Sequence, residues 1–208
     1  MTLLLARHGQ TVWNASRRFQ GITDVGLSER GRAQAEALGR RLSGRRLAAV
    51  YASPLRRARE TAAIVVPELA GSVTCVDALR ELSLGAWEGR TVDEIRGQAG
   101  DPYLAWLRAP HDCLPPGGEP LDRVAARVRQ ALEAIAAAHG DEDEVLVVAH
   151  GGVISVYACD LLGSSFNGLW RLRVDNCSLT VVKPPRLVSI NDTSHLPDGL
   201  GSQHLTRA

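Results

Sequence analysis

Two short apolar runs in this sequence each end in a histidine that glycine follows. Leu3–Ala6 precedes Arg7-His8-Gly9, and Val145–Ala149 precedes His150-Gly151-Gly152. A fully apolar run of this length is typical of a strand buried on both faces, as in a parallel sheet. Because the carboxyl ends of parallel strands meet at the same edge of the sheet, we expect both imidazoles to lie near one point.

Strand-like and helix-like segments alternate along the chain. Strands are predicted at Thr2–Ala6, Leu47–Ala52, Val73–Val76 and Val145–Ala149, with a closing antiparallel pair at Leu169–Val174 and Ser178–Val182. Helices are predicted after Ser28, Ser53-Pro54, Thr91, Asp101 and Gly151, and over Glu119–His139. This alternation predicts an α/β fold, a three-layer sandwich in which a mainly parallel central sheet carries helices on both faces.

The length of the chain fits one compact unit. Its 208 residues, 45% of them hydrophobic, are enough for a full core, so we expect a single domain over residues 1–208. The stretch from about 85 to 120 is the least regular part and holds several prolines and two tryptophans. Irregular insertions of this length are often functional, and we expect this one to form a lid or substrate wall.

Composition narrows the class of partner and the location. Lys+Arg 24 against Asp+Glu 23 leaves a net charge of +1, which argues against a general nucleic-acid or membrane binder. The four cysteines form no Cys-x-x-Cys pair, so we expect reduced thiols that mostly fill the core. With no charged segment ahead of the first strand and no membrane-length apolar run, we expect a cytoplasmic protein.

A cluster of cations is expected where the strands end. Arg7 and His8 follow the first strand, His150 follows a later one, and Arg57 lies in the first turn of a helix after Ser53-Pro54. Guanidinium groups match phosphate oxygens bidentately, and positive neighbours favour the neutral imidazole. A neutral imidazole beside a bound phosphorus is a nucleophile, so the spacing indicates a phosphate-binding α/β domain.

Two further features fit phosphate chemistry. A helix is expected to begin at Gly151, and the free backbone N–H groups at a helix N-terminus attract anions. Glu81, just after the third predicted strand, is the candidate proton donor to a leaving alkoxide.

Six motifs in order resemble the histidine phosphatase superfamily, the phosphoglycerate-mutase-like fold. They cover residues from about 2 to 180 and are Leu5-Ala6-Arg7-His8-Gly9-Gln10-Thr11-Val12-Trp13-Asn14, Ser53-Pro54-Leu55-Arg56-Arg57-Ala58-Arg59-Glu60-Thr61-Ala62, Leu79-Arg80-Glu81, Gly85-Ala86-Trp87-Glu88-Gly89, Pro116-Gly117-Gly118-Glu119 and Val148-Ala149-His150-Gly151-Gly152. The resemblance implies that His8 becomes phosphohistidine and that Glu81 protonates the leaving group. It implies further that Arg7, Arg57 and His150 hold the phosphoryl oxygens.

The resemblance also implies binding residues around the phosphate. Asn14 and Thr11 would donate hydrogen bonds, and Gln20 and Gly21 belong to the segment that is similar to the small bacterial phosphatase branch. The resemblance implies that no metal is needed. For this chain we expect no cofactor and a small-molecule phosphate ester as substrate.

The resemblance leaves several functions open. We expect a metal-independent phosphomonoesterase, with a cofactor-dependent phosphoglycerate mutase and a catalytically silent phosphometabolite-binding domain as alternatives. The branch includes broad-specificity, α-ribazole and glucosyl-phosphoglycerate phosphatases, so the substrate stays open. The chain could act as a monomer or a homodimer. The segment Asn191–Leu196 is also similar to this branch, and no physical role is assigned to it.

Overall fold

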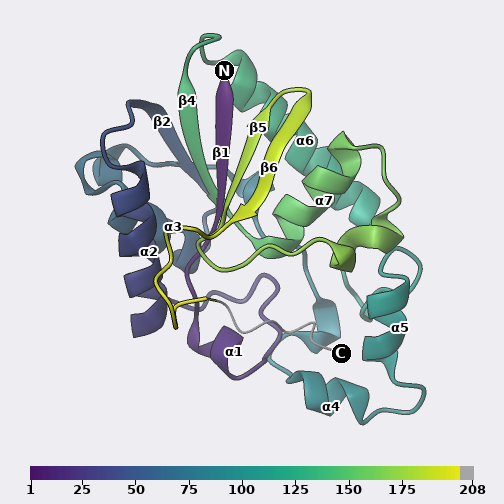
Figure 1. Ribbon diagram of the computed structural model, residues 1–208. Helices are drawn as coiled ribbons and strands as arrows, with labels where there is room; N and C mark the ends of the chain where they lie inside the picture. Colours follow the sequence, from purple (N-terminus) through teal and green to yellow (C-terminus); the bar gives the residue numbers. More distant parts are fainter. Residues whose placement is uncertain (202–208) are drawn as a thin grey trace.

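The computed structural model describes residues 1–201. Within them, six strands form one sheet in the order β3-β2-β4-β1-β5-β6 (Figure 1). The strands are β1 (Thr2–Arg7), β2 (Leu47–Ala52), β3 (Thr74–Cys75), β4 (Glu144–Ala149), β5 (Leu179–Lys183) and β6 (Arg186–Asp192). Strands β1 to β4 pair in parallel, and β5 and β6 add an antiparallel edge beside β1. This arrangement confirms the mainly parallel sheet.

Seven α-helices accompany the strands in the described residues. They are α1 (Val12–Ala15), α2 (Glu29–Leu42), α3 (Arg56–Val65), α4 (Val92–Arg96), α5 (Pro102–Arg108), α6 (Leu121–Ala137) and α7 (Gly151–Leu161). Short 3₁₀ helices lie at Pro67–Ser72, Asp77–Leu79, Gly85–Trp87 and Phe166–Arg171.

Alternate residues of the central strands bury opposite faces of the sheet. On β4, Leu146 and Val148 pack with α2 and α3, whereas Val145 and Val147 pack with α6 and α7. Figure 1 shows α2 and α3 on one side of the sheet and α6 and α7 on the other. The expected three-layer sandwich is confirmed, because strands with apolar residues at every position need cover on both faces.

The structure corrects the expected closing pair of strands. Residues 169–174 do not pair in the sheet: Phe166–Arg171 is a 3₁₀ helix, and β5 pairs instead with β6 through the Pro184-Pro185 turn. The position beside β5 is therefore occupied by a later segment. Residues 169–174 are left to pack beyond the sheet.

Three smaller expectations also need correction. The helix predicted from Ser53-Pro54 begins at Arg56 with Leu55 as its N-cap, because the Ser53 hydroxyl is buried against His150. The loop from 7 to 27 contains the short helix α1. Two of the four cysteines, Cys75 and Cys113, are exposed, so only half of them fill the core.

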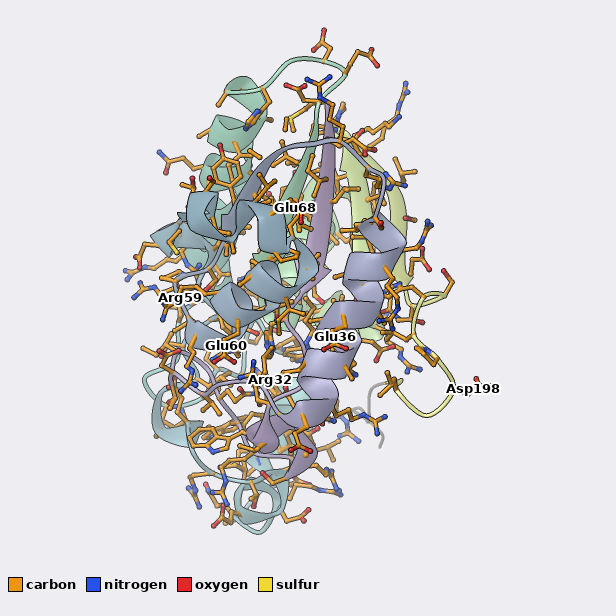
Figure 2. The ribbon with its side chains drawn as sticks, turned by 90° about the vertical axis from the view of Figure 1, so that its left-hand side faces the viewer. Arg32, Glu36, Arg59, Glu60, Glu68 and Asp198 are labelled. Carbon is orange, nitrogen blue, oxygen red and sulfur yellow. The ribbon has the colours of Figure 1, made fainter. Side chains whose placement is uncertain are left out.

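The outer face of α2 and α3 is charged. Arg32, Glu36 and Arg59 are exposed on it, and Glu60 accepts hydrogen bonds from Arg32 and Arg56 (Figure 2). Among residues 1–201, no helix combines the length and the apolar character needed to cross a membrane.

Candidate active site

The carboxyl ends of β1, β2 and β4 bring the predicted cationic side chains together. The ring centroids of His8 and His150 lie 5.1 Å apart. Nε of Arg57 donates to Nδ1 of His150 over 3.3 Å, and Nε2 of His150 lies 2.7 Å from Oγ of Ser53. The meeting point expected from the two His-Gly strand ends is present, with β4 between β1 and β2.

His8 is a buried, neutral imidazole with a defined tautomer. Its Nδ1 lies 2.7 Å from the carbonyl oxygen of Gly9, which can only accept, so Nδ1 carries the proton. Burial and the guanidinium groups of Arg57 and Arg7 hold the pKa of His8 well below its ordinary value of 6.5. The lone pair is therefore on Nε2, the nitrogen a nucleophilic histidine would use.

The backbone around His8 is fully hydrogen-bonded. His8 N–H donates to Ala149, and the His8 carbonyl accepts from Asn176. The N–H of Gly9 donates to the Thr61 hydroxyl, and its carbonyl accepts from the imidazole of His8. Partners for Gln10 come from α2 and its cap: Gln34 accepts from the Gln10 N–H, and Ser28 donates to the Gln10 carbonyl. We call residues 7–10 the His8 loop.

His150 lies behind the site. It is fully buried, and burial together with the charge of Arg57 lowers its pKa well below 6.5. Because its Nδ1 accepts from Arg57, the proton is on Nε2, which donates to Ser53. His150 does not line the cavity described below. Direct contact between His150 and a phosphoryl group stays a prediction.

The two predicted arginines are anchored differently. Arg57 is 1% exposed and donates Nη1 to the carbonyl of Thr23 and Nη2 to that of Gly21. Its burial lowers its pKa from 12.5 to about 10, so it stays charged at neutral pH. Arg7 donates Nη1 to Val174 over 2.7 Å, while its buried Nε has no hydrogen-bond partner within residues 1–201.

Glu81 lies against the N-terminus of α7. Its carboxylate accepts from the N–H of Gly152 over 3.3 Å and from that of Leu82 over 3.0 Å. A Cβ at Gly152 would contact the Leu82 side chain and lie 2.6 Å from the Glu81 carboxylate, so a larger residue there would displace both side chains. The helix N-terminus expected to face an anion thus also positions the candidate acid.

An ion pair that sequence reasoning did not single out supports Glu81. Arg127 on α6 donates to both carboxylate oxygens of Glu119, at 2.8 and 2.9 Å. The same guanidinium donates to the backbone carbonyls of Ala78, Arg80 and Glu81. Glu119 ends the Pro-Gly-Gly-Glu motif, so the motif was visible in the sequence although its partner was not.

The predicted phosphate-binding residues near α1 form one hydrogen-bonded group. Thr11 caps α1, its hydroxyl donates to Oε1 of Gln20 over 2.9 Å, and its N–H donates to Oδ1 of Asn14 over 3.0 Å. Asn14, Gln20 and Gly21 line the cavity, whereas Thr11 is fully buried behind them. Thr11 is therefore placed to orient Asn14 and Gln20.

A cavity of about 130 Å³ joins these residues. Eight of the ten predicted site residues line it: Arg7, His8, Asn14, Gln20, Gly21, Arg57, Glu81 and Gly151. Its other end is apolar, with Leu82, Leu84, Leu172 and Val174 beside an aromatic group. We call Phe19, Tyr103, Trp106 and Trp170 the aromatic wall.

The aromatic wall comes from three separate segments. Phe19 follows α1, Tyr103 and Trp106 lie on α5, and Trp170 lies in the 3₁₀ helix after α7. The rings of Trp106 and Trp170 have centroids 4.4 Å apart, and those of Phe19 and Trp106 lie 5.8 Å apart. Asn167 ties the segments together, because it accepts from the N–H of His111 and donates to Asp112.

The stretch from 85 to 120 therefore supplies only part of the wall. Trp170, Leu172 and Val174 lie in the segment predicted as a strand, so the sequence pattern missed them.

Arg18 also lines the cavity and donates to the carbonyl of Gly89. Glu88, from the Gly-Ala-Trp-Glu-Gly motif, accepts from Ile22, Thr23 and Leu84 and joins the two sides of the cavity.

The arrangement can bind a dianion and attack it. Two guanidinium groups, the amide of Asn14 and a helix N-terminus surround a neutral imidazole, with a carboxylate nearby. In the part of the chain that the structure describes, no group of three or more His, Cys, Asp or Glu side chains could hold a metal ion.

Comparison with known proteins identifies the family to which the chain belongs. The sequence profile of the histidine phosphatase superfamily (branch 1) matches residues 3–189, and the chain belongs to this superfamily. It is 33% identical over 198 residues to phosphoserine phosphatase 1 of Hydrogenobacter thermophilus, covering 93% of each chain. It is 35% identical to a probable phosphoglycerate mutase of Erwinia tasmaniensis, covering 95% of this chain and 96% of the relative.

A solved structure gives the same class. The mycobacterial glucosyl-3-phosphoglycerate phosphatase, determined with VO3, superposes with a TM-score of 0.83 at 34% identity, covering 91% of this chain and 98% of that chain. The phosphoglycerate-mutase-like fold expected from the motifs is confirmed.

Proposed function

We propose that this chain is a metal-independent phosphomonoesterase that hydrolyses small-molecule phosphate esters through a phosphohistidine at His8. The observation that carries the proposal is the state of His8. It is neutral, its Nδ1–H donates to the Gly9 carbonyl, and it lines a cavity that Arg7 and Arg57 also line. Relatives named as phosphatases support the reaction class.

In the first step, Nε2 of His8 attacks the phosphorus and the bond to the ester oxygen breaks. Arg7, Arg57 and Asn14 hold the phosphoryl oxygens, and the buried Nε of Arg7 is a donor with no other partner in residues 1–201. Glu81 gives its proton to the departing oxygen, which leaves as an alcohol.

In the second step, water attacks the phosphohistidine. The carboxylate of Glu81 takes a proton from the water, the P–N bond breaks, and phosphate leaves with His8 neutral again. His150 acts through Arg57: it accepts from Arg57 Nε and keeps the guanidinium beside the phosphoryl group.

The cavity favours hydrolysis over mutase chemistry. A mutase needs a second group of cations for the other anionic end of its substrate and must keep water from the phosphohistidine. Arg90, Arg96 and Arg108 of the predicted wall segment are not among the residues that line the cavity. Among the described residues that line the cavity, Arg18 is the single arginine besides Arg7 and Arg57, and it donates to the Gly89 carbonyl, so it does not form the second group of cations that a mutase needs. We propose that residues 1–208 act as one domain in which the 85–120 segment is part of a wall for apolar or variable leaving groups.

Phosphate release from a nitrophenyl ester, measured with and without a chelator, tests the proposal. We expect release at the same rate in both conditions. No release in either condition would favour the catalytically silent binding domain. Release that is lost when the chelator is added would contradict metal independence.

A second assay separates phosphatase from mutase. The enzyme is given 3-phosphoglycerate with 2,3-bisphosphoglycerate, and free phosphate and 2-phosphoglycerate are followed together. Phosphate release with little isomerisation is expected, and faster isomerisation would support the mutase. A panel of phosphorylated metabolites then ranks the substrates.

The cytoplasm is the proposed location. It is supported by four free cysteines, two of them buried. Cell fractionation tests this location, and light scattering decides between a monomer and a homodimer.

A further inference from the structure

The described C-terminal segment, residues 193–201, runs from β6 to the N-terminal half of α2. Figure 2 shows it beside α2, with Asp198 labelled on it. Its backbone carbonyls accept hydrogen bonds from α2: Arg30 donates to Gly199 and Gly201, and Gln34 donates to Leu200 over 2.7 Å. The proposed reaction assigns this segment no role.

Gln34 connects the segment to the His8 loop. It is fully buried, and while its amide nitrogen donates to Leu200, its amide oxygen accepts the N–H of Gln10 over 2.9 Å. Gln10 lies two residues after His8. One side chain therefore holds both the C-terminal segment and the end of the His8 loop.

His195 makes a second connection. Burial lowers its pKa below 6.5, so it is neutral, and its Nε2 donates to the carbonyl of Cys177 over 2.9 Å. The N–H of Cys177 in turn donates to the carbonyls of Arg7, at 3.0 Å, and His8, at 3.3 Å. Cys177 has a φ of +55°, in the left-handed region that non-glycine residues rarely adopt.

These two connections reach the His8 loop from both sides of the nucleophile. The Gln34 connection ends on the N–H of Gln10, after the nucleophile. The Cys177 connection ends on the carbonyls of Arg7 and His8. The direction in which Nε2 points depends on the backbone at these residues. Small errors in the position of a nucleophile cost rate rather than affinity.

We propose that residues 193–201 are a C-terminal brace that fixes the attack geometry of His8, with Gln34 and His195 as its positioning residues. The inference rests on the proposed function, because it needs His8 to be the nucleophile. Residues 193–201 are not among the residues that line the cavity, and they reach Arg7 only through its backbone carbonyl, so we expect the brace to act on the chemical step more than on substrate binding.

The test measures the single-turnover rate at which His8 is phosphorylated by a nitrophenyl ester in full-length variants. His195→Phe keeps a ring but removes the donor, His195→Gln restores a donor, and Arg30→Ala releases the carbonyls of Gly199 and Gly201. Arg32→Ala is the matched control, since Arg32 lies on the same helix but pairs with Glu60. Melting temperature and the affinity for inorganic phosphate are measured on each variant.

We expect His195→Phe to slow phosphorylation about tenfold and Arg30→Ala about threefold, with phosphate affinity within about twofold of wild type in both. His195→Gln should recover most of the rate, and Arg32→Ala should match wild type. Wild-type phosphorylation rates in both brace variants would overturn the brace, even if their melting temperatures fall. If His195→Phe does not fold, Arg30→Ala decides the question. Absence of phosphohistidine in wild type would instead overturn the proposed function.

Discussion

The two ends of the cavity are built in different ways. In the His8 loop, the N–H and carbonyl groups of His8, Gly9 and Gln10 all have hydrogen-bond partners. In the aromatic wall, the indole nitrogens of Trp106 and Trp170 are buried without a hydrogen-bond partner among residues 1–201. The phosphoryl end is thus specified by directed polar contacts and the leaving-group end by packing. We expect such a site to fix the reaction while it accepts a range of leaving groups.

Removing the acid separates the two ends most strongly. Glu81→Gln loses the proton donor, so hydrolysis of an alkyl phosphate should fall by about 10²–10⁴. A nitrophenyl ester has a good leaving group that needs little protonation, so release of its alcohol should slow far less. Single-turnover rates of alcohol release on both substrates make the comparison, because this step precedes the attack of water that Glu81 also assists. An equal loss on both would assign Glu81 a structural role through Gly152 and Leu82.

Arg57→Lys weakens the phosphoryl end while keeping its charge. We expect a loss of about 2–4 kcal/mol of transition-state stabilisation, because lysine has no planar fork. The melting temperature should also fall, since the hydrogen bonds to Gly21, Thr23 and His150 are lost. Full activity in a folded variant would show that Arg57 only supports the 21–23 loop.

Trp170→Leu should weaken the leaving-group end alone. A stacked aromatic contact is worth about 0.5–1.5 kcal/mol, or roughly two- to tenfold in KM for a naphthyl phosphate. Trp170→Phe is the control that keeps a ring. Hydrolysis of a small alkyl phosphate should change little in either variant. A loss of kcat on every substrate would mean that Trp170 supports the phosphoryl end through Val174 and Arg7.

Acid should destabilise the phosphoryl end. The pKa values of His8 and His150 are lowered well below 6.5 in the folded protein, so the unfolded chain binds more protons below that pH. Stability from these groups is complete above about pH 6.5 and is lost as the pH falls toward the folded pKa values. The melting temperature of the ligand-free protein should drop in this window. His8→Asn should show a shallower drop, and an identical pH profile would contradict the assignment.

The difference between the two ends also explains what the sequence could predict. Arg7, His8, Arg57 and Glu81 sit in local motifs at the ends of strands, and the parallel topology alone brings them together. Trp170 does not lie in such a motif. The run Leu169–Val174 around it alternates like a strand, so the local pattern predicts a strand there and not part of a cavity wall. Its actual conformation depends on β6 taking the place beside β5 and on Asn167 bonding to residues 111 and 112. Both depend on tertiary contacts, which local sequence periodicity cannot predict.

The positions of the buried residues behind the site could not be predicted from local sequence either. The motifs predict that Thr11 and His150 contact the phosphate, and this stays a prediction. Their position behind the cavity wall follows from side-chain hydrogen bonds to Gln20, Ser53 and Arg57. Arg127 lies in a helix of ordinary pattern, so nothing local distinguishes it from a surface arginine. Only the folded chain shows that it holds the backbone at Glu81.

Trapping the covalent intermediate tests the central claim most directly. Enzyme is mixed with a nitrophenyl ester and quenched within one turnover in alkaline denaturant, where phosphohistidine is stable, and peptide mass spectrometry locates the phosphate. We predict one phosphate on His8 in the wild type and none in His8→Ala, whose turnover should fall by a factor on the order of 10³ or more. Phosphate on another residue, or near-normal turnover in His8→Ala, would contradict the account.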